Sequence, residues 1–373
     1  MELRNYTPFA PLVFSAEDDA GTEMGVLVVR GTFRVVPGAA LRPDPDQAPI
    51  RVADVYRGAP GASSVRWEGD LAPLKPRADV HLDAVAHAPG GEPAPSWTAG
   101  VRVARRDGRG EPERLVEAAL RVTGPRAWRR GLTGWRLDAP APAVRVPVVY
   151  ERAYGGAVPD PDEPDRAVEY PANPVGTGFF LPGQTETDEV AAPQLEWADA
   201  PVDVPGLDYE PAGLGPLARS WQPRLGLAGT FDQAWQVERA PHLPADFDFA
   251  HYNSAPPALQ APSYLTGDET VTVWGLRPDA PTVSVCLPGY RLAALLRYQD
   301  GTVNAAPLRI DTVELDLADP DPDGHRAALV WRSQFPQRTP LRVVEVRMEL
   351  PETPPAPDAD LARAPQLAAV THG

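Results

Sequence analysis

Cysteine and lysine are almost missing from this chain of 373 residues. The one cysteine, Cys286, cannot form a disulfide within the chain. Lysine is nearly absent and arginine supplies almost all of the positive charge, which we attribute to genome composition and not to function. The chain has no apolar run of about 18 residues, as a membrane-spanning helix requires, and its start, MELRNYTPFAPLVF, lacks the basic and apolar regions of a signal peptide. These absences predict a soluble cytoplasmic protein that does not insert into membranes.

Negative charge is in excess and lies mainly in the C-terminal part of the chain. The net charge is −16; residues 1–150 carry 20 basic and 18 acidic side chains, and residues 151–373 carry 15 and 33. A chain with this charge is not expected to bind nucleic acid. The acidic excess either keeps the protein soluble or steers the approach of a basic partner surface.

Proline is unusually frequent and limits the length of helices. The chain has 47 prolines, more than twice the usual proportion, and they are spread along it. Helices longer than about three turns are therefore scarce. The stretch TFDQAWQVERAP at 230–241 is the best helix pattern, because Asp232 can cap its start and Pro241 stops it.

Strand patterns dominate the rest of the chain. Residues 25–38 are rich in β-branched side chains, and we expect a bulge at Gly31. A later pattern alternates at period two, and the residues that share its apolar face are Val80, Leu82, Ala84 and Ala86. Strands do not alternate with helices, which argues against a doubly wound parallel sheet. We predict a mainly β fold of about ten to fourteen strands, with antiparallel β-sandwich-type sheets, long ordered loops and one or two short helices.

The chain is predicted to form one large domain with a tail. Residues 1–350 are either a single β-rich domain or two packed sub-domains, 1–156 and 217–350, joined by the loop region 157–216. That loop region is rich in proline, glycine and acidic residues, and it is either ordered by packing on the domain or mobile and used for binding. Residues 351–373 are proline-rich, with few large apolar side chains, and are predicted to be disordered.

Three short motifs resemble ligand sites but fit other structures better. DPDPDG at 319–324 opens like a calcium loop, but Val330 stands where the twelfth position should be Glu, so we predict a hairpin turn. GLGPLA at 213–218 matches the dinucleotide fingerprint, but no strand precedes it. Cys286 lies in a strand pattern and is predicted to be a buried thiol. The chain contains none of the motifs GxSxG, HExxH and CxxC.

The stretch HLPADFDFAHYNSAP at 242–256 gathers His242, Asp246, Asp248 and His251 within ten residues. Two histidines and a carboxylate could bind zinc or iron. In an extended segment the two aspartates would share one face, where they could instead accept hydrogen bonds from backbone amides or arginine. The residues alone favour a structural or interaction role and leave a metal site or an acid–base site as alternatives.

Eight phrases in one order resemble a known family. They are VVRGTF (28–33), DLAPLKPRADV (70–80), YERAYGG (150–156), NPVGTGF (173–179), PAGLGPLARSWQPR (211–224), AGTFDQAW (228–235), LPADFDFAHYNSAP (243–256) and GDETVTVWGL (267–276). This series resembles a domain-of-unknown-function family encoded beside VgrG spike and PAAR tip genes in type VI secretion loci. The resemblance extends to about residue 350. Some members of that family are fused to pentapeptide repeats, which this chain lacks.

The resemblance implies a non-enzymatic adaptor or chaperone that helps to load an effector onto the VgrG/PAAR spike. It implies no catalytic residues, no metal and no cofactor, and its partners are the secreted effector and the spike proteins. We expect the loop region 157–260 to be presented to those partners. The residues that either bind a partner or anchor these loops are Tyr154, Gly155, Gly156, Asn173, Trp221, Arg224, Asp232, Trp235, Asp246, Asp248, His251 and Asn253.

The sequence leaves two other functions open. One is a metal-dependent hydrolase centred on Asp246, Asp248 and His251. The other is a carbohydrate-binding β-sandwich that uses exposed tryptophans.

Overall fold

The structure is a computed structural model that describes residues 1–18, 20–132, 134–160, 162–163, 165–181, 189–337 and 340–364. In this part of the chain most regular structure is β-strand, in several mostly antiparallel sheets, and the one α-helix is α1 (Gln233–Glu238). The predicted mainly β, sandwich-type fold is confirmed. No helix among the described residues is long and apolar enough to cross a bilayer.

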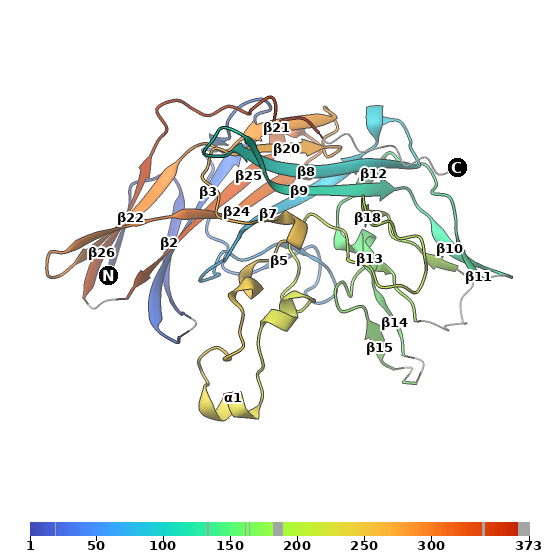
Figure 1. The fold of residues 1–373 in the computed structure, drawn as a ribbon, viewed down its shortest axis with the longest axis horizontal. Coiled ribbons are helices and arrows are strands. Elements are labelled where there is room, and N and C mark those ends of the chain that lie inside the picture. The colour runs from blue at the N-terminus through green and yellow to red at the C-terminus, as the bar shows by residue number, and fades with distance from the viewer. Residues whose placement is uncertain are drawn as a thin grey trace.

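Two large sheets form the body of the molecule (Figure 1). The larger has eight strands; its main path is β12-β7-β24-β25-β3-β2, and β19 pairs with β7 and β4 with β3. The smaller has five strands in the order β18-β9-β8-β20-β21. The strands of the larger sheet are β2 (Ala10–Glu17), β3 (Glu23–Arg34), β4 (Arg42–Pro43), β7 (Ala78–His87), β12 (Arg145–Pro147), β19 (Gln260–Ala261), β24 (Arg309–Leu317) and β25 (Arg326–Pro336). The strands of the smaller sheet are β8 (Ser96–Arg106), β9 (Pro112–Thr123), β18 (Leu195–Trp197), β20 (Thr270–Trp274) and β21 (Thr282–Cys286).

Smaller sheets and single turns complete the described structure. A four-stranded sheet contains β1 (Glu2–Asn5), β26 (Leu341–Glu349), β22 (Arg291–Tyr298) and β23 (Val303–Pro307). A three-stranded sheet contains β11 (Gly134–Leu137), β10 (Ala127–Gly131) and β17 (Glu189–Ala191). The two-stranded pairs are β5 (Val55–Tyr56) with β6 (Val65–Trp67), β13 (Tyr154–Gly155) with β16 (Thr177–Gly178), and β14 (Ala157–Pro159) with β15 (Ala167–Glu169). The 3-10 turns are η1 (Pro89–Gly91), η2 (Tyr150–Arg152), η3 (Arg224–Leu227), η4 (Phe249–Tyr252), η5 (Pro257–Leu259) and η6 (Pro322–Gly324).

One hydrophobic core lies between the large sheets. Because side chains alternate along a strand, β7 directs the predicted apolar set at positions 80, 82, 84 and 86 to one face, and all four side chains belong to this core. The same core includes Val313 of β24 and Val101 of β8. Since β7 and β24 come from opposite ends of the chain and pair in parallel, the core draws side chains from both 1–156 and 217–350.

Several local predictions are confirmed. Asp232 caps α1 by accepting a hydrogen bond from the backbone N–H of Trp235 at 2.8 Å. The segment 319–324 turns between β24 and β25, which pair antiparallel. Cys286 is fully buried on β21, where burial together with Asp268 and Glu269 raises the pKa of its thiol to about 12.

The bulge predicted at Gly31 is wrong. Strand β3 pairs with β25 in continuous register through Gly31, which lies opposite Leu329. A Cβ atom at this position would lie 2.9 Å from ring atoms of Phe9 and of Phe33. Glycine is therefore needed here because aromatic rings pack directly against the backbone, and not because the strand bends.

The described part of the loop region 157–216 is ordered by a small second core and by side chains such as Leu195 and Leu214 that belong to the main core. The buried members of this second cluster are Trp128, Tyr154, Phe180, Ala192 and Val202. Tyr154 packs edge-on against Tyr170 and Tyr209, and its hydroxyl donates to the carbonyl of Leu207 at 2.7 Å. Of the two alternatives left open by the sequence, packing on the domain describes this region.

The C-terminal segment 351–364 packs on the body, which corrects the prediction of disorder for these residues. Leu361 is 6% exposed, and the backbone N–H of Asp358 donates to Thr270 on β20 at 3.0 Å. Arg106 on β8 also forms ion pairs with Asp358 and Asp360. The composition is poor in apolar residues, but one buried leucine and several polar contacts hold the segment. The rest of the predicted tail, 365–373, lies outside the described residues.

Candidate functional site

The face of the eight-stranded sheet that points away from the core is charged. On β7 the residues between the apolar ones are Asp79, His81 and Asp83, and all three are buried. The parallel register places Glu314 of β24 opposite His81. In an antiparallel or mixed sheet such a face usually meets water, so the burial of these charges requires a cover.

Two loop segments, 44–77 and 211–256, provide that cover. Lys75, the only lysine in the chain, donates to Asp79 at 2.8 Å and to Glu68 at 3.3 Å. Glu68 also accepts from Arg224 at 2.6 Å. Burial alone would raise the pKa of Glu68, but Lys75 and Arg224 outweigh it and lower that pKa. Asp79 of the sheet thus meets a positive charge from a loop, whereas Asp311 pairs with Arg332 within the sheet.

A second group of charges joins the first loop to the middle of the sheet. Arg30 on β3 donates to Asp70 at 3.0 Å, and Arg51 donates to Glu314 at 2.8 Å. Burial opposes the ionised form of Glu314, but Arg30 and Arg51 lower its pKa to about 2. Together these groups form the buried charged layer, which we define as the partly buried Arg51 and the buried Arg30, Glu68, Asp70, Lys75, Asp79, Arg224, Asp311, Glu314 and Arg332.

The buried charged layer has no room for a substrate. The gap lined by Glu68, Asp70, Lys75 and Glu314 does not admit a water-sized sphere. Removing one member of a buried charge pair typically costs about 3–5 kcal/mol, because the other charge is left without compensation. The buried charged layer therefore holds the loops in place on the sheet.

One predicted site residue, Arg224, belongs to the buried charged layer, and two others, His251 and Asn253, form hydrogen bonds with its members. The guanidinium of Arg224 donates to the carbonyl of His251 at 3.0 Å, and the ring nitrogen Nδ1 of His251 lies 2.9 Å from the carbonyl of Arg224. The side chain of Asn253 donates to Asp79 at 2.9 Å. Burial and the nearby Arg224 lower the pKa of His251, although its hydrogen bond to the Arg224 carbonyl acts in the opposite direction. These residues anchor loops and are not free to bind a ligand.

The other polar residues of 242–256 do not converge on one point. Asp246 accepts from the backbone and hydroxyl of Thr230, Asp248 caps η4, and His242 pairs with Glu17 at 2.8 Å. In the part of the chain that the structure describes, no group of three or more His, Cys, Asp or Glu side chains could hold a metal ion. The arrangement of Asp246, Asp248 and His251 is therefore that of three separate structural contacts.

The predicted residues at 154–173 and Trp221 are parts of the framework. Gly155 has φ +145°, and a Cβ atom there would lie 2.2 Å from the carbonyl oxygen of Asn173. Gly156 also has a positive φ, +119°. Asn173 is fully buried and donates to the carbonyls of Tyr150 and Tyr154. Trp221 is buried and packs edge-on against Tyr150. None of these side chains offers a surface to a partner.

An exposed element remains, which we call the arm and define as residues 228–247. Figure 1 shows it projecting from the body, with α1 at its far end. At its base Asp246 bridges the two limbs by accepting from Thr230 at 2.9 Å and 2.7 Å. Next to this bridge Phe231 is 57% exposed and packs edge-on against Trp235 of α1, and Val237 on α1 is 78% exposed. The arm therefore presents apolar side chains on a supported base.

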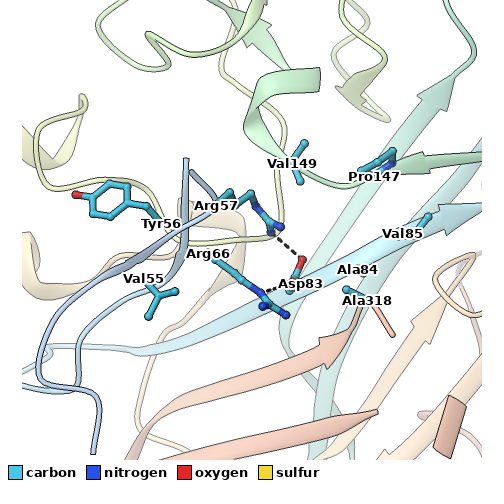
Figure 2. Close-up of a pocket in the computed structure, with 10 residues that line it drawn as sticks. All are labelled: Val55, Tyr56, Arg57, Arg66, Asp83, Ala84, Val85, Pro147, Val149 and Ala318. Carbon is cyan, nitrogen blue, oxygen red and sulfur yellow. Dashed lines mark hydrogen bonds and ion pairs between the residues drawn. The ribbon is translucent and has the colours of Figure 1, made fainter. Parts of the chain in front are cut away.

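A cavity of about 380 Å³ lies beside the charged face of the sheet. Figure 2 shows Asp83 of β7 between the guanidinium groups of Arg57 and Arg66. Arg57 donates to Asp83 at 2.8 Å. The walls are formed by Val55, Tyr56, Ala84, Val85, Pro147, Val149 and Ala318. The sequence reasoning did not identify this site, because Arg57 and Arg66 lie in a segment without a recognisable motif.

The comparisons identify a family without an assigned activity. No curated protein and no solved structure matches the chain. A family model matches residues 20–332, which include the buried charged layer, the arm and the cavity. The chain therefore belongs to the family described as an uncharacterized protein conserved in bacteria (DUF2169).

Proposed function

We propose that this protein is a non-enzymatic adaptor or chaperone that helps to load an effector onto the VgrG/PAAR spike of a type VI secretion system. The body provides a rigid framework, and the arm contacts the effector or a spike protein. Contact with the arm would cover apolar surface on the cargo until the cargo is placed on the spike.

The observation that carries this proposal is the arm. Val237 on the short helix α1 is 78% exposed, and Phe231, just before the helix, is 57% exposed. Aromatic and apolar anchors of this kind supply much of the binding energy at protein interfaces. Because Asp246 joins the two limbs of the arm and Arg224 anchors the adjoining turn η3, little conformational entropy is lost when the arm binds.

The phrases behind the family resemblance support the same role. DLAPLKPRADV supplies Asp70, Lys75 and Asp79 of the buried charged layer, and PAGLGPLARSWQPR supplies Arg224. AGTFDQAW forms the first limb of the arm. The residues that carry the resemblance therefore form part of the buried charged layer and of the arm, as expected of an adaptor that uses a fixed docking element.

The test is capture of the proteins encoded by the neighbouring genes. We expect the purified chain to capture an effector or a VgrG or PAAR protein from a co-expression lysate. The double variant Phe231→Ala/Val237→Ala should weaken that capture about tenfold or more, because loss of an interface anchor costs 1–2 kcal/mol or more and about 1.4 kcal/mol is tenfold. Its melting temperature should stay unchanged, since both side chains are exposed.

The matched control is Val52→Ala/Val303→Ala, which removes two apolar side chains that are 68% and 47% exposed elsewhere. This control should capture partners as the unaltered chain does. If the unaltered chain captures none of these partners, the adaptor function is wrong. If it captures them and both double variants do so equally well, the function stands but the arm is not the docking element.

A further inference from the structure

The cavity in Figure 2 is built around one buried carboxylate and two arginines. Asp83 is 3% exposed, while the side chains of Arg57 and Arg66 are 21% and 38% exposed. One oxygen of Asp83 accepts from Arg57 and the other from Arg66. Asp83 thus fixes both guanidinium groups at the cavity without using all of their donors.

The guanidinium group of Arg57 has most of its donors left. An arginine side chain offers five N–H donors. Among the described residues, Arg57 uses one donor, to Asp83, and Arg66 uses two, to Asp83 and Asp316. Since Arg66 is shared by two carboxylates and Arg57 is bonded to one, Arg57 has the larger capacity to bind an added anion.

The walls determine what kind of anion fits. The cavity volume of about 380 Å³ lies within the range of small-molecule sites. Valine, alanine and proline side chains line the space beside the two arginines. Such walls favour a ligand with a short apolar part, and a guanidinium fork matches the two oxygens of a carboxylate.

We propose that this cavity binds an organic carboxylate with a short apolar substituent, and that Arg57 is its principal ligand. The carboxylate can come from a free small acid or from the C-terminus or an acidic side chain of a polypeptide. Its oxygens accept hydrogen bonds from the unused donors of Arg57, and its substituent contacts the walls near Val149 and Ala318. This inference does not rest on the adaptor function, because the binding step involves the purified chain alone.

A larger hollow lacks the same features. It has a volume of about 920 Å³ and is lined by several prolines and by Arg277. The guanidinium of Arg277 is already held on one side by both oxygens of Asp279, and its remaining terminal nitrogen lies 3.1 Å from His325. A buried arginine with these partners has little capacity for an added carboxylate, so the cavity at Arg57 is the better anion site.

The experiment follows the Nε–H signal of Arg57 by NMR in protein labelled with ¹⁵N-arginine, at constant ionic strength. The probes are isobutyrate, N-acetyl-alanyl-valine with a free carboxylate, and the same dipeptide as its C-terminal amide. We expect both acids to shift the Arg57 signal saturably in the millimolar range, and the amide to cause no saturable shift. Arg57→Gln assigns the signal.

Variants separate binding from folding. Arg57→Gln should weaken binding of the acids at least tenfold, as measured on the Arg66 signal, and Asp83 keeps Arg66 as its partner in that variant. The matched control is Arg105→Gln, which removes an arginine of similar exposure, 23%, that pairs with the carboxylates of Glu113 and Glu269 away from the cavity. Ala318→Leu narrows the cavity without altering either arginine, so it should also weaken binding while the Arg57 signal persists.

Each outcome of these measurements either supports or overturns the proposal that the cavity binds a carboxylate. Comparable affinity for isobutyrate and the dipeptide acid identifies a free small acid as sufficient, and at least tenfold tighter binding of the dipeptide identifies a polypeptide carboxylate. The proposal is overturned if neither acid gives a saturable shift of Arg57, or if the amide binds as well as the acid. It is also overturned if Arg105→Gln weakens binding as much as Arg57→Gln does.

Discussion

The two faces of the eight-stranded sheet are both buried, but by different physical means. One face carries alternate apolar side chains, such as Leu82 and Val313, and packs on the five-stranded sheet. The other carries Asp79 and Glu314 and is covered by loops with opposite charges. Apolar burial is non-directional and tolerates small shifts, whereas buried charges need their partners in place. The first face holds the sheets together, and the second determines where the loops lie.

The largest expected effect is on the charged face. Glu68→Ala removes the carboxylate shared by Lys75 and Arg224. We expect it to lower the free energy of unfolding by about 3–5 kcal/mol at neutral pH, because two buried cations lose a partner. Urea unfolding followed by circular dichroism measures this loss. A loss below about 1 kcal/mol would mean that the loops are held by other contacts.

A substitution on the apolar face should destabilise the protein by an amount that does not depend on pH. Leu82→Ala deletes a fully buried side chain on the same strand as Asp79 and should cost about 2–5 kcal/mol through lost burial and a cavity. This cost should be the same at pH 7 and pH 3.5. The cost of Glu68→Ala should shrink as pH falls, since the folded state lowers the pKa of Glu68: its stabilisation is full above the pKa of the unfolded chain and is lost as pH falls from there toward the lowered pKa. Equal pH dependence of the two variants would contradict the comparison.

Glu314 allows the acid response to be assigned to one group. Its pKa is about 2 in the folded protein and about 4.3 in an unfolded chain. Its stabilisation is therefore full above about pH 4.3 and is lost as pH falls toward 2. Glu314→Gln should cost about 1.5–3 kcal/mol at pH 7, the range for hydrogen bonds to a charged group. In that variant the decline of stability between pH 4.3 and 2 should be less steep than in the unaltered chain; an unchanged slope would place the acid-sensitive group elsewhere.

The smallest effect is expected from charge pairs outside the layer. Glu113 on β9 pairs with Arg105 on β8, and their side chains are 39% and 23% exposed. Glu113→Gln should change the free energy of unfolding by less than about 1 kcal/mol, because ion pairs that water reaches contribute little. Differential scanning calorimetry at low and high salt checks this value. A cost similar to that of Glu68→Ala would show that burial does not distinguish the two kinds of pair.

The apolar face could be predicted from the sequence, and the charged face could not. Period-two alternation identified the inward side chains of β7, because that pattern is local. The partners of the charged side chains are distant: Arg51 and Glu314 are separated by 263 positions. Charged residues at alternate positions of a strand ordinarily indicate a face in contact with water. The alternating pattern therefore predicted an exposed face where the structure has a buried one.

The stretch 242–256 shows a similar limit at the candidate site. Its composition showed that His242, Asp246, Asp248 and His251 were candidates, but not where each side chain points. The structure pairs them with Glu17, Thr230, a backbone N–H and the carbonyl of Arg224 respectively. The helix of the arm was predictable because its cap, Asp232, and its stop lie within the same short segment.

Lys75 has one more consequence, which concerns chemical labelling. It is the only lysine in the chain, and 3% of its side chain is exposed. Burial alone would lower its pKa, but Asp79 and Glu68 outweigh burial and raise it, so the folded protein holds this amine both shielded and protonated. A reagent that acylates neutral amines therefore meets, apart from the α-amino group, a single target that reacts only when the loops lift from the sheet. The rate of acylation at Lys75, measured by mass spectrometry, would report how often the loops separate from the sheet.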